Sequence, residues 1–470
     1  MAAIEPIDWE KATDACVAHL RDLIRIPSVN PPGNPTAAGG HDSSGGESRA
    51  AGYCAEILAA AGIAAELLES EPGRGSCFAR LPATVPGPEP PLILLSHIDV
   101  VPVEAHAWSR DPFGAELVDG EVWGRGAVDM KAMVAMELSV MQELARSAAP
   151  RQRDIIFAAV ADEEAGGTHG ALHWVQERPD LFSDAAGRPA AAALNEIGGY
   201  SMTIGDRRFY AVQVAEKGII WTRIRATGTP SHGSMPAPDN AAIRLAVAVA
   251  RLAAEPRPAR VGPVVRRFFD GLGLSDVADL AEQGQDAEAG ARLAAAVHDP
   301  VLQRSLSAML RDTVTPNVIH VGHKMNVVPG SGEAEVDVRT LPDTDQQAFL
   351  AELQAIAGDE VVVESVHTMP PVEAPSDSEI AGLMDEALRA ADPEATPLQM
   401  MITPGTDAKA LNLLGIPTYG FTPLRLRPEE PFLSLFHAND ERIPVSALRF
   451  GLPVLHEVVS RFVLAEPPSA

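Results

Sequence analysis

The stretch Leu92-Ile93-Leu94-Leu95-Ser96-His97-Ile98-Asp99 places a histidine and a carboxylate directly after an apolar run. A short continuous run of this kind predicts a strand that is buried on both faces of a sheet. Ile155 to Val160 is a second such run, and Asp162-Glu163-Glu164 follows it. In open α/β sheets, sites form outside the carboxyl ends of the strands. The sequence therefore predicts an α/β fold in which polar site residues gather at one edge of a sheet.

Further candidate ligands follow along the chain. Asp129 ends the Gly-rich segment Gly124-Arg125-Gly126-Ala127-Val128, Glu196 follows the small-residue run Ala190 to Ala193, and His437 lies far downstream. Each motif alone has another interpretation, because Asp129 could interact with a helix N-terminus and the adjacent glutamates could be solvated charges. Together, two histidines and three carboxylates with a spare Glu are what two divalent ions need to share a bridging carboxylate. The joint pattern indicates a two-metal hydrolase.

Composition excludes several other classes of protein. The chain has 470 residues, which predicts two domains, and 64 acidic against 37 basic residues give a formal net charge of -27. Nucleic acid and anionic membranes bind proteins with an excess of Lys and Arg, so we expect neither partner. Cys16, Cys54 and Cys77 lack metal-type spacing and fit a reducing compartment. Because no apolar run is long enough to span a bilayer and Met1 to Pro6 carries no secretory signal, we expect a cytoplasmic location.

The order of expected elements divides the chain into a domain and an insertion. Residues 1–215 alternate helix and strand, beginning with a helix that Asp8 can cap. Residues 216–368 contain strands of alternating polarity, such as Trp221 to Ala226, which predict a smaller α+β domain with an antiparallel sheet and helices on one face. Residues 369–470 resume the α/β pattern and would complete the first domain.

Other segments have simpler signals. The Pro, Gly and Ser content of Pro31 to Gly46 predicts a loop, and the polar stretch Pro256 to Pro316 predicts a helical insertion without assigned chemistry. Further helices and strands are expected at Glu47 to Ala61, Asn240 to Ala254, Val318 to Val321, Ala334 to Thr340, Asp345 to Ile356, Glu360 to Val366, Met400 to Ile402, Thr418 to Gly420 and Val445 to Val463.

These motifs together resemble the M20 family of metallopeptidases and amidohydrolases, and the resemblance covers essentially the whole chain. It implies a mixed-sheet catalytic domain that holds two zinc ions, with an inserted lid and dimerisation domain. It implies His97 and Glu196 as ligands of one ion, and Glu164 and His437 as ligands of the other. Asp129 is the implied bridging carboxylate. Cobalt and manganese can share such ligands, so the physiological metal stays open.

The resemblance also implies roles around the ions. Glu163 resembles the general base, and Asp99 resembles the residue that orients His97. A cis peptide bond is implied between Asp129 and Met130.

The predicted inserted domain carries matching signals for binding the substrate. Thr229-Pro230-Ser231-His232-Gly233-Ser234 resembles the segment of the lid histidine, which stabilises the oxyanion in the partner subunit's active site and thereby implies a homodimer. Asn326 and Arg339 resemble the residues that hold the substrate carboxylate or polarise its carbonyl. Gly405 and Thr406 resemble the loop that lines the substrate pocket.

Within the family, Glu216-Lys217-Gly218 and the His232 segment look most like the carboxypeptidase S and N-acyl-amino-acid hydrolase branch, beside relatives of the aminoacylase-1 and glutamate carboxypeptidase types. We therefore expect hydrolysis of the amide bond in an N-acyl-L-amino acid or a dipeptide with a free carboxylate. A deacetylase or desuccinylase of a biosynthetic intermediate remains an alternative, because loops such as Leu424 to Phe432 decide the shape of the acyl pocket. A non-catalytic metal-binding relative would be marked by the loss of Glu163 or of a ligand, and all are present.

Overall fold

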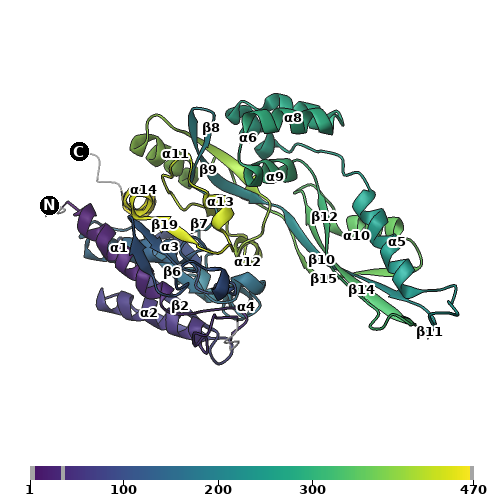
Figure 1. Cartoon of the computed structure of the whole chain (residues 1–470). Helices are drawn as coiled ribbons and strands as arrows, with labels where there is room; N and C mark the ends of the chain where they lie inside the picture. Colours follow the sequence, from purple (N-terminus) through teal and green to yellow (C-terminus); the bar gives the residue numbers. More distant parts are fainter. Residues whose placement is uncertain (1–5, 33–36, 466–470) are drawn as a thin grey trace. The chain divides into compact units, whose positions relative to one another are not determined.

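The structure is a computed structural model that describes residues 6–32 and 37–465 (Figure 1). Two expectations concern residues outside these ranges. They are residues 1–5 of the N-terminal segment in which we expect no secretory signal, and residues 33–36 of the predicted loop. The chain divides into two compact units. Unit 1 comprises Met1–Val214, Ala374–Gln399 and Thr406–Ala470, and unit 2 comprises Ala215–Glu373 and Met400–Gly405.

The sheet of unit 1 is mixed, with parallel strands at its centre (Figure 1). β3 (Glu89–His97) pairs in parallel with β6 (Arg153–Val160) on one side and with β7 (Ala192–Asn195) on the other. β18 (Thr418–Gly420) continues the parallel set beside β7, whereas β2 pairs antiparallel with β6. The predicted α/β fold with a mixed sheet is thereby confirmed.

Among the described residues, ten strands belong to this sheet, in the order β1-β2-β6-β3-β7-β18-β9-β16, with β8 and β17 also paired with β9. The end strand β16 and the last residues of β9 and β17 fall within the bounds of unit 2. The bounds of the outer strands are β1 (Ala65–Glu69), β2 (Gly75–Leu81), β8 (Ser201–Ile204), β9 (Arg207–Glu216), β16 (Val372–Glu373) and β17 (Thr396–Ile402). A separate antiparallel sheet contains β4 (Glu116–Val118), β5 (Glu121–Trp123) and β19 (Arg442–Pro444).

Both faces of the central strands are buried. Ile93 and Leu95 of β3 pack in one cluster with Trp174 of α4, whereas Leu92 and Leu94 point to the opposite face and are equally inaccessible. This two-sided burial is the reason that the run is apolar at every position.

The helices of unit 1 cap and pack as their sequences predict. The Asp8 carboxylate accepts the Lys11 N–H at 3.2 Å and caps the first helix, and the last helix has the predicted bounds. The helices described in this unit are α1 (Trp9–Ile24), α2 (Gly46–Ala60), α3 (Lys131–Arg146), α4 (Ala171–Glu177), α11 (Glu379–Ala391), α12 (Ala408–Asn412), α13 (Phe432–Leu435) and α14 (Val445–Val463), with 3-10 turns η1 (Ala105–Ala107), η2 (Glu163–Ala165) and η3 (Pro179–Phe182).

Unit 2 contains an antiparallel sheet in the order β12-β14-β10-β15, and α5 and α10 pack on one face of it. Buried and exposed residues alternate along β10, which is the pattern of a sheet with one covered face. The elements are β10 (Gly218–Thr227), β12 (Thr313–Val321), β14 (Ser331–Thr340), β15 (Val361–Met369), α5 (Ala241–Ala254) and α10 (Gln346–Ala357), with a two-stranded sheet of β11 (Ser231–His232) and β13 (Val327–Val328).

The expected start of β12 is too late, because the strand begins at Thr313 rather than at Val318. Pro316 had marked the end of the insertion, yet it lies within the strand, where the pairing register shifts between Pro316 and Val318. β12 is an edge strand, and edge strands and bulges are where a sheet tolerates proline.

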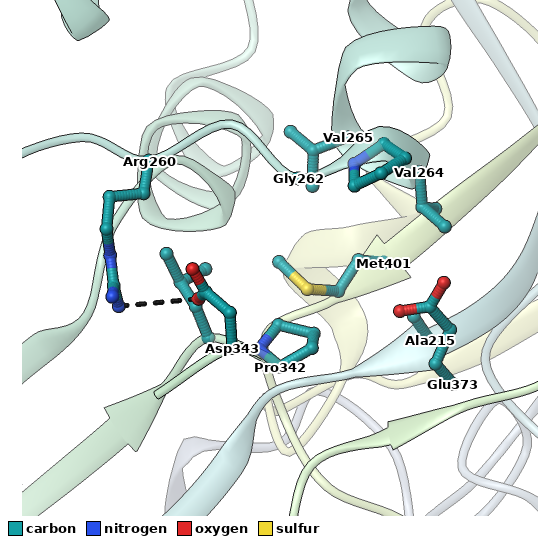
Figure 2. A pocket seen from close by; sticks show the side chains of 11 residues that line it. Ala215, Arg260, Gly262, Val264, Val265, Pro342, Asp343, Glu373 and Met401 are labelled. Carbon is teal, nitrogen blue, oxygen red and sulfur yellow. Dashed lines mark ion pairs between the residues drawn. The ribbon is translucent and has the colours of Figure 1, made fainter. Parts of the chain in front are cut away.

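The helical insertion of unit 2 borders a cavity of about 290 Å³ (Figure 2). Its apolar walls include Val264, Leu341 and Met401, and Arg260 pairs with Asp343 at 3.5 Å beside them. The helices of the insertion are α6 (Pro263–Leu272), α7 (Ser275–Glu282), α8 (Asp286–Ala296) and α9 (Pro300–Met309). Within residues 6–32 and 37–465, no helix has both the length and the apolar character to cross a bilayer.

Candidate metal centre and active site

Three neighbouring strands of unit 1 end beside candidate ligands. His97 is the last residue of β3, Glu163 and Glu164 form the turn after β6, and Glu196 directly follows β7. Because these strands are parallel neighbours, their carboxyl ends lie at the same edge of the sheet. The sheet therefore brings together side chains that are up to about a hundred residues apart in the chain.

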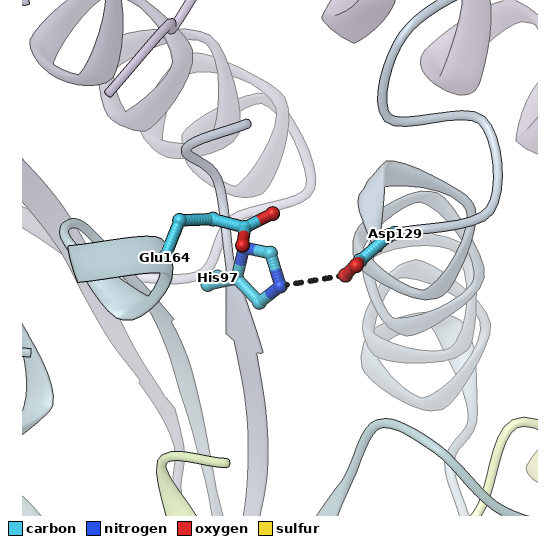
Figure 3. Close-up of side chains that lie close together, drawn as sticks. All are labelled: His97, Asp129 and Glu164. Carbon is cyan, nitrogen blue, oxygen red and sulfur yellow. Dashed lines mark hydrogen bonds and ion pairs between the residues drawn. The ribbon is translucent and has the colours of Figure 1, made fainter. Parts of the chain in front are cut away.

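Two overlapping groups of side chains meet at this edge. One contains His97, Asp129 and Glu164 (Figure 3), and the other contains His97, Glu163 and Glu196. Within each group the nitrogen and oxygen atoms that could bind a metal all lie within 4.8 Å of one another. The two groups share His97, so they form one compact centre.

Asp129 lies between the two histidines. Its Oδ1 is 3.0 Å from His97 Nε2, and its Oδ2 is 3.1 Å from His437 Nε2. His437 Nε2 is also 3.1 Å from Glu164 Oε2, while His97 Nε2 is 3.6 Å from Glu196 Oε2. Each oxygen of Asp129 therefore faces a different histidine, which is the arrangement that a carboxylate shared by two ions requires.

Asp99 contacts the opposite side of the His97 ring and the turn that carries Glu163 and Glu164. Its Oδ1 is 3.4 Å from His97 Nδ1, and its two oxygens accept the N–H groups of Glu163 at 3.1 Å and Glu164 at 3.2 Å. A carboxylate behind the ring leaves Nε2 directed toward Asp129. The cis peptide bond expected between Asp129 and Met130 is present.

Burial and crowding of like charges shift the pKa values of this centre. Burial, followed by the Asp129 charge, raises the pKa of Glu164 to about 7, and burial also raises the pKa of Glu196 to about 7. The pKa of Glu163 lies well above its usual value, first because of burial and then because of Glu196. Hydrogen bonds to Asp129 and Glu164 raise the pKa of His437 to about 10.

The donor set fits divalent metal ions. Glu164 Oε1 is buried and makes no hydrogen bond to any residue that the structure describes. Crowded carboxylates with an unsatisfied oxygen gain a partner when a cation binds, and imidazole with carboxylate suits zinc, cobalt and manganese. His97, Asp129, Glu164, Glu196 and His437 are thus able to hold two ions.

In unit 2, the structure brings His232 and Asn326 together. His232 of β11 lies opposite Val327 of β13, and the Gly233 N–H donates to the Asn326 carbonyl at 2.9 Å. Both side chains are exposed.

Arg339 belongs to β14 of the four-stranded sheet, whereas His232 and Asn326 lie at the small sheet of β11 and β13. It is eight residues beyond Ser331, the first residue of β14, which corresponds to roughly 27 Å along a strand. Its guanidinium makes two hydrogen bonds to Asp337, at 2.7 Å and 2.9 Å. Arg339 therefore does not form one cluster with His232 and Asn326 within this unit.

Thr406 and Gly405 stand where the chain passes from unit 2 to unit 1. Thr406 is buried, and its hydroxyl oxygen accepts hydrogen bonds from the Asn195 side chain at 3.0 Å and from the Ala408 N–H at 3.1 Å. Asn195 precedes Glu196, so Thr406 supports the segment of a candidate ligand.

Sequence reasoning missed a buried network behind the turn that carries Glu163 and Glu164. The Asn30 amide donates to Asp99 at 2.8 Å and to Asp162 at 3.1 Å. Arg74 forms ion pairs with Glu47 and Asp162, and Glu47 accepts the Asp162 N–H at 3.1 Å. Asp162 adopts a φ of 68°, a conformation that a non-glycine residue holds when its surroundings fix it. Asp162 beside the two glutamates was a visible signal, whereas Asn30 had none.

The comparisons with known proteins agree with this geometry. A model of "Peptidase family M20/M25/M40" matches residues 93–461. Aminoacylase-1 from Sus scrofa is 29% identical over 404 residues, covering 82% of this chain and 83% of that protein. N-fatty-acyl-amino acid synthase/hydrolase PM20D1 from Bos taurus is 27% identical over 399 residues, covering 80% of this chain and 75% of that protein.

A solved structure gives the same picture for the fold. The M20 family metallo-carboxypeptidase Sso-CP2 from Sulfolobus solfataricus superimposes with a TM-score of 0.67 at 18% identity, covering 94% of this chain and 98% of that chain. Because the family match extends over well more than half of the sequence, the chain belongs to peptidase family M20/M25/M40 and is a metal-dependent amidohydrolase or metallopeptidase.

Proposed function

We propose that the protein hydrolyses the amide bond of N-acyl-L-amino acids or of dipeptides with a free carboxylate, with two divalent ions, zinc first among them. The observation that carries this proposal is the position of Asp129, whose oxygens face His97 at 3.0 Å and His437 at 3.1 Å. A single carboxylate between two histidines, with Glu164 and Glu196 beside it, suits a pair of ions better than one ion.

The ions and Glu163 would have different roles in the reaction. When bound by His97 and Glu196, by Glu164 and His437, and by Asp129 between them, the ions supply Lewis acidity that polarises the amide carbonyl and acidifies water. Glu163 would accept the proton of the attacking water and deliver it to the leaving nitrogen. Burial and the Glu196 charge raise its pKa, which makes the carboxylate a stronger base than an exposed glutamate and supports this role.

His232 would donate a hydrogen bond to the oxyanion. The Ser234 backbone N–H donates to His232 Nδ1 at 3.2 Å, so Nδ1 is an acceptor and the neutral ring carries its hydrogen on Nε2. The Ser234 hydroxyl lies 2.8 Å from the same nitrogen. The exposed Nε2 edge is therefore the donor, as oxyanion stabilisation requires.

The separation within unit 2 supports action by two subunits. Arg339 lies roughly 27 Å along β14 from Ser331, the strand end that follows the β13 segment paired with His232, whereas a dipeptide spans at most about 7 Å. A substrate whose carboxylate binds Arg339 would therefore meet His232 and Asn326 of the partner subunit in a homodimer.

The surface of unit 2 is consistent with such a dimer. Ile243 of α5 is 63% exposed and Ile319 of the edge strand β12 is 52% exposed. An apolar edge strand beside an apolar helix face is a surface that pairs with another chain.

A cytoplasmic location stays a prediction, supported by three free, buried cysteines.

Turnover of a substrate panel tests the function. Purified protein would be given N-acetyl, long-chain N-acyl and dipeptide substrates, with and without chelator and with Zn²⁺ or Co²⁺ added back, beside Glu163→Ala. We expect cleavage that disappears with chelator, returns with metal and falls at least about 100-fold in the variant. Among the substrates, long-chain N-acyl-amino acids and dipeptides distinguish the hydrolase subtypes.

The panel also includes N-acetyl and N-succinyl amino acids whose side chains carry an amine. Preference for these would favour a biosynthetic deacetylase or desuccinylase. Turnover that resists chelation, or an unimpaired Glu163→Ala variant, would contradict the proposal.

A further inference from the structure

Glu441 is a fully buried carboxylate that accepts hydrogen bonds from four donors. Its Oε1 accepts the N–H groups of Val128 at 2.6 Å and Asp129 at 3.1 Å. Its Oε2 accepts the Gly126 N–H at 3.0 Å and Arg125 Nη1 at 2.7 Å. A carboxylate has about four acceptor positions, so the side chain is saturated by one short segment.

The bonds join two parts of the chain that are more than 300 residues apart. Residues 124–129 end at Asp129, and Glu441 follows His437 by four residues. The backbone reinforces the link, because the Gly124 N–H donates to the Glu441 carbonyl at 2.9 Å. Arg125 Nη2 lies 3.4 Å from the His437 carbonyl, so the arginine contacts the second segment as well.

We propose that Glu441 is the positioning residue that fixes Asp129 relative to His437, and thereby sets the affinity of the ion that these two residues share. The inference rests on the proposed function for the identity of that ion. The bonds of Glu441 and Arg125 reach Asp129 and the His437 segment, but neither His97 nor Glu196. Two ligands of one ion are therefore affected, against only the shared Asp129 of the other, so the influence is expected to be larger on the ion at His437.

Glutamine is an informative replacement because it keeps the shape of the side chain. Both carboxylate oxygens face pairs of hydrogen-bond donors, so the amide nitrogen of Glu441→Gln would oppose donors in either orientation. The loop that carries Asp129 would lose two of its four bonds to the side chain and gain a repulsive contact. Arg125→Lys is a milder change, because it disturbs one donor to Glu441 and the weak contact with the His437 carbonyl but leaves the three backbone N–H groups in place.

Metal binding and amide exchange test the proposal together. Bound Zn²⁺ would be counted by mass spectrometry during titration of chelator-treated protein, for wild type, Glu441→Gln and Arg125→Lys. We expect Glu441→Gln to keep one tight ion and to bind the second about 10- to 100-fold more weakly, with Arg125→Lys between it and wild type. Hydrogen exchange of the peptide covering residues 124–131, measured without metal, should be faster in Glu441→Gln.

Asp392→Asn is the matched control. Asp392 is also buried, 3% exposed, and accepts hydrogen bonds from Arg208 at 2.7 Å and from the Tyr210 hydroxyl at 3.1 Å, apart from the candidate ligands. This variant should lose stability and keep both ions.

Two outcomes overturn the inference. One is unchanged affinity for the second ion in Glu441→Gln. The other is a loss of affinity for both ions that is as large in Asp392→Asn as in Glu441→Gln. If Glu441→Gln does not fold, Arg125→Lys decides in the same way. A third outcome separates the two proposals. If the wild type binds no second ion while hydrogen exchange is still faster in Glu441→Gln, the proposed function is contradicted and the role of Glu441 in holding the loop stands.

Discussion

The candidate residues of unit 1 and of unit 2 are held in different ways. His97, Asp129 and Glu196 are buried, and the hydrogen bonds of each lead to another member of the centre or to its supporting network. His232 and Asn326 of unit 2 are exposed, and their hydrogen bonds stay within the small sheet of β11 and β13 and the residues next to it. The candidate metal centre is therefore built by the fold of unit 1, whereas the candidate residues of unit 2 lie exposed on a small sheet.

This difference in burial predicts how mutations in each unit should affect function. In a buried centre, removal of one carboxylate leaves other charged groups without a partner, so the effects spread through the site. At an exposed residue, truncation removes one interaction and leaves its surroundings intact. Mutations in unit 1 should therefore change metal binding and turnover together, and mutations in unit 2 should change turnover or substrate binding alone.

Asp129→Ala should have the largest effect. Because Asp129 faces both histidines, its loss weakens both ions, and turnover should fall to background. Activity and metal content measured on the same preparation check this. If Asp129→Ala keeps two ions and measurable turnover, the expectation that mutations in unit 1 change metal binding and turnover together is wrong.

His232→Ala should lower kcat by about 100- to 1,000-fold while the metal content stays at the wild-type value. Mixed dimers sharpen the test. If His232 acts in the partner subunit, subunits carrying His232→Ala and subunits carrying Glu163→Ala form dimers in which one site has both residues, and activity returns on mixing. Mixing after chemical cross-linking of each separate dimer is the control. No recovery from freely exchanging subunits would place His232 in its own subunit's site.

Arg339→Ala should raise KM for substrates with a free carboxylate by about 10- to 100-fold, which corresponds to the roughly 1.5 to 3 kcal/mol of a hydrogen bond to a charged group. Asp337 already holds the guanidinium with two bonds, so the cost of replacing that partner limits the size of the effect. The matched substrate is the same molecule with an amidated carboxyl group, for which wild type and variant should have equal KM. An equal rise in KM for both substrates would show that Arg339 does not recognise the carboxylate.

Glu137→Gln should have the smallest effect on activity and a visible one on stability. Glu137 is fully buried, neither of its oxygens makes a hydrogen bond within the described residues, and burial raises its pKa to about 8. The folded state therefore holds the proton more tightly than the unfolded state, so this contribution to stability is present at low pH and is lost as pH rises through about 8.

The expected loss in the wild type between pH 6 and pH 9 is on the order of 2 kcal/mol in the free energy of unfolding. The neutral glutamine should remove this slope, and denaturant unfolding at several pH values measures it. Identical slopes for wild type and Glu137→Gln would show that the buried acid is not the cause.

The candidate ligands could be picked out because each has a strong local signal. His97 ends the apolar strand β3, Glu164 lies in the turn after the apolar strand β6, and Asp129 ends a segment rich in glycine. The supports were not predictable in the same way. Glu441 and Asn30 act on residues far away in the chain, and only the folded sheet brings them close.

Edges of the fold were also harder to predict than its centre. The apolar strands β3 and β6 were visible, whereas the start of β12 was hidden by Pro316. The separation of Arg339 from His232 could not be read from motifs, because a motif gives residue type and not distance along a sheet.

The number of divalent ions bound by wild type, His97→Ala and His437→Ala tests most directly whether Asp129 is shared by two ions. We expect two ions per wild-type chain and one ion in each histidine variant, measured by mass spectrometry after dialysis against metal-free buffer. One ion in the wild type, or two ions retained in either histidine variant, would contradict this expectation.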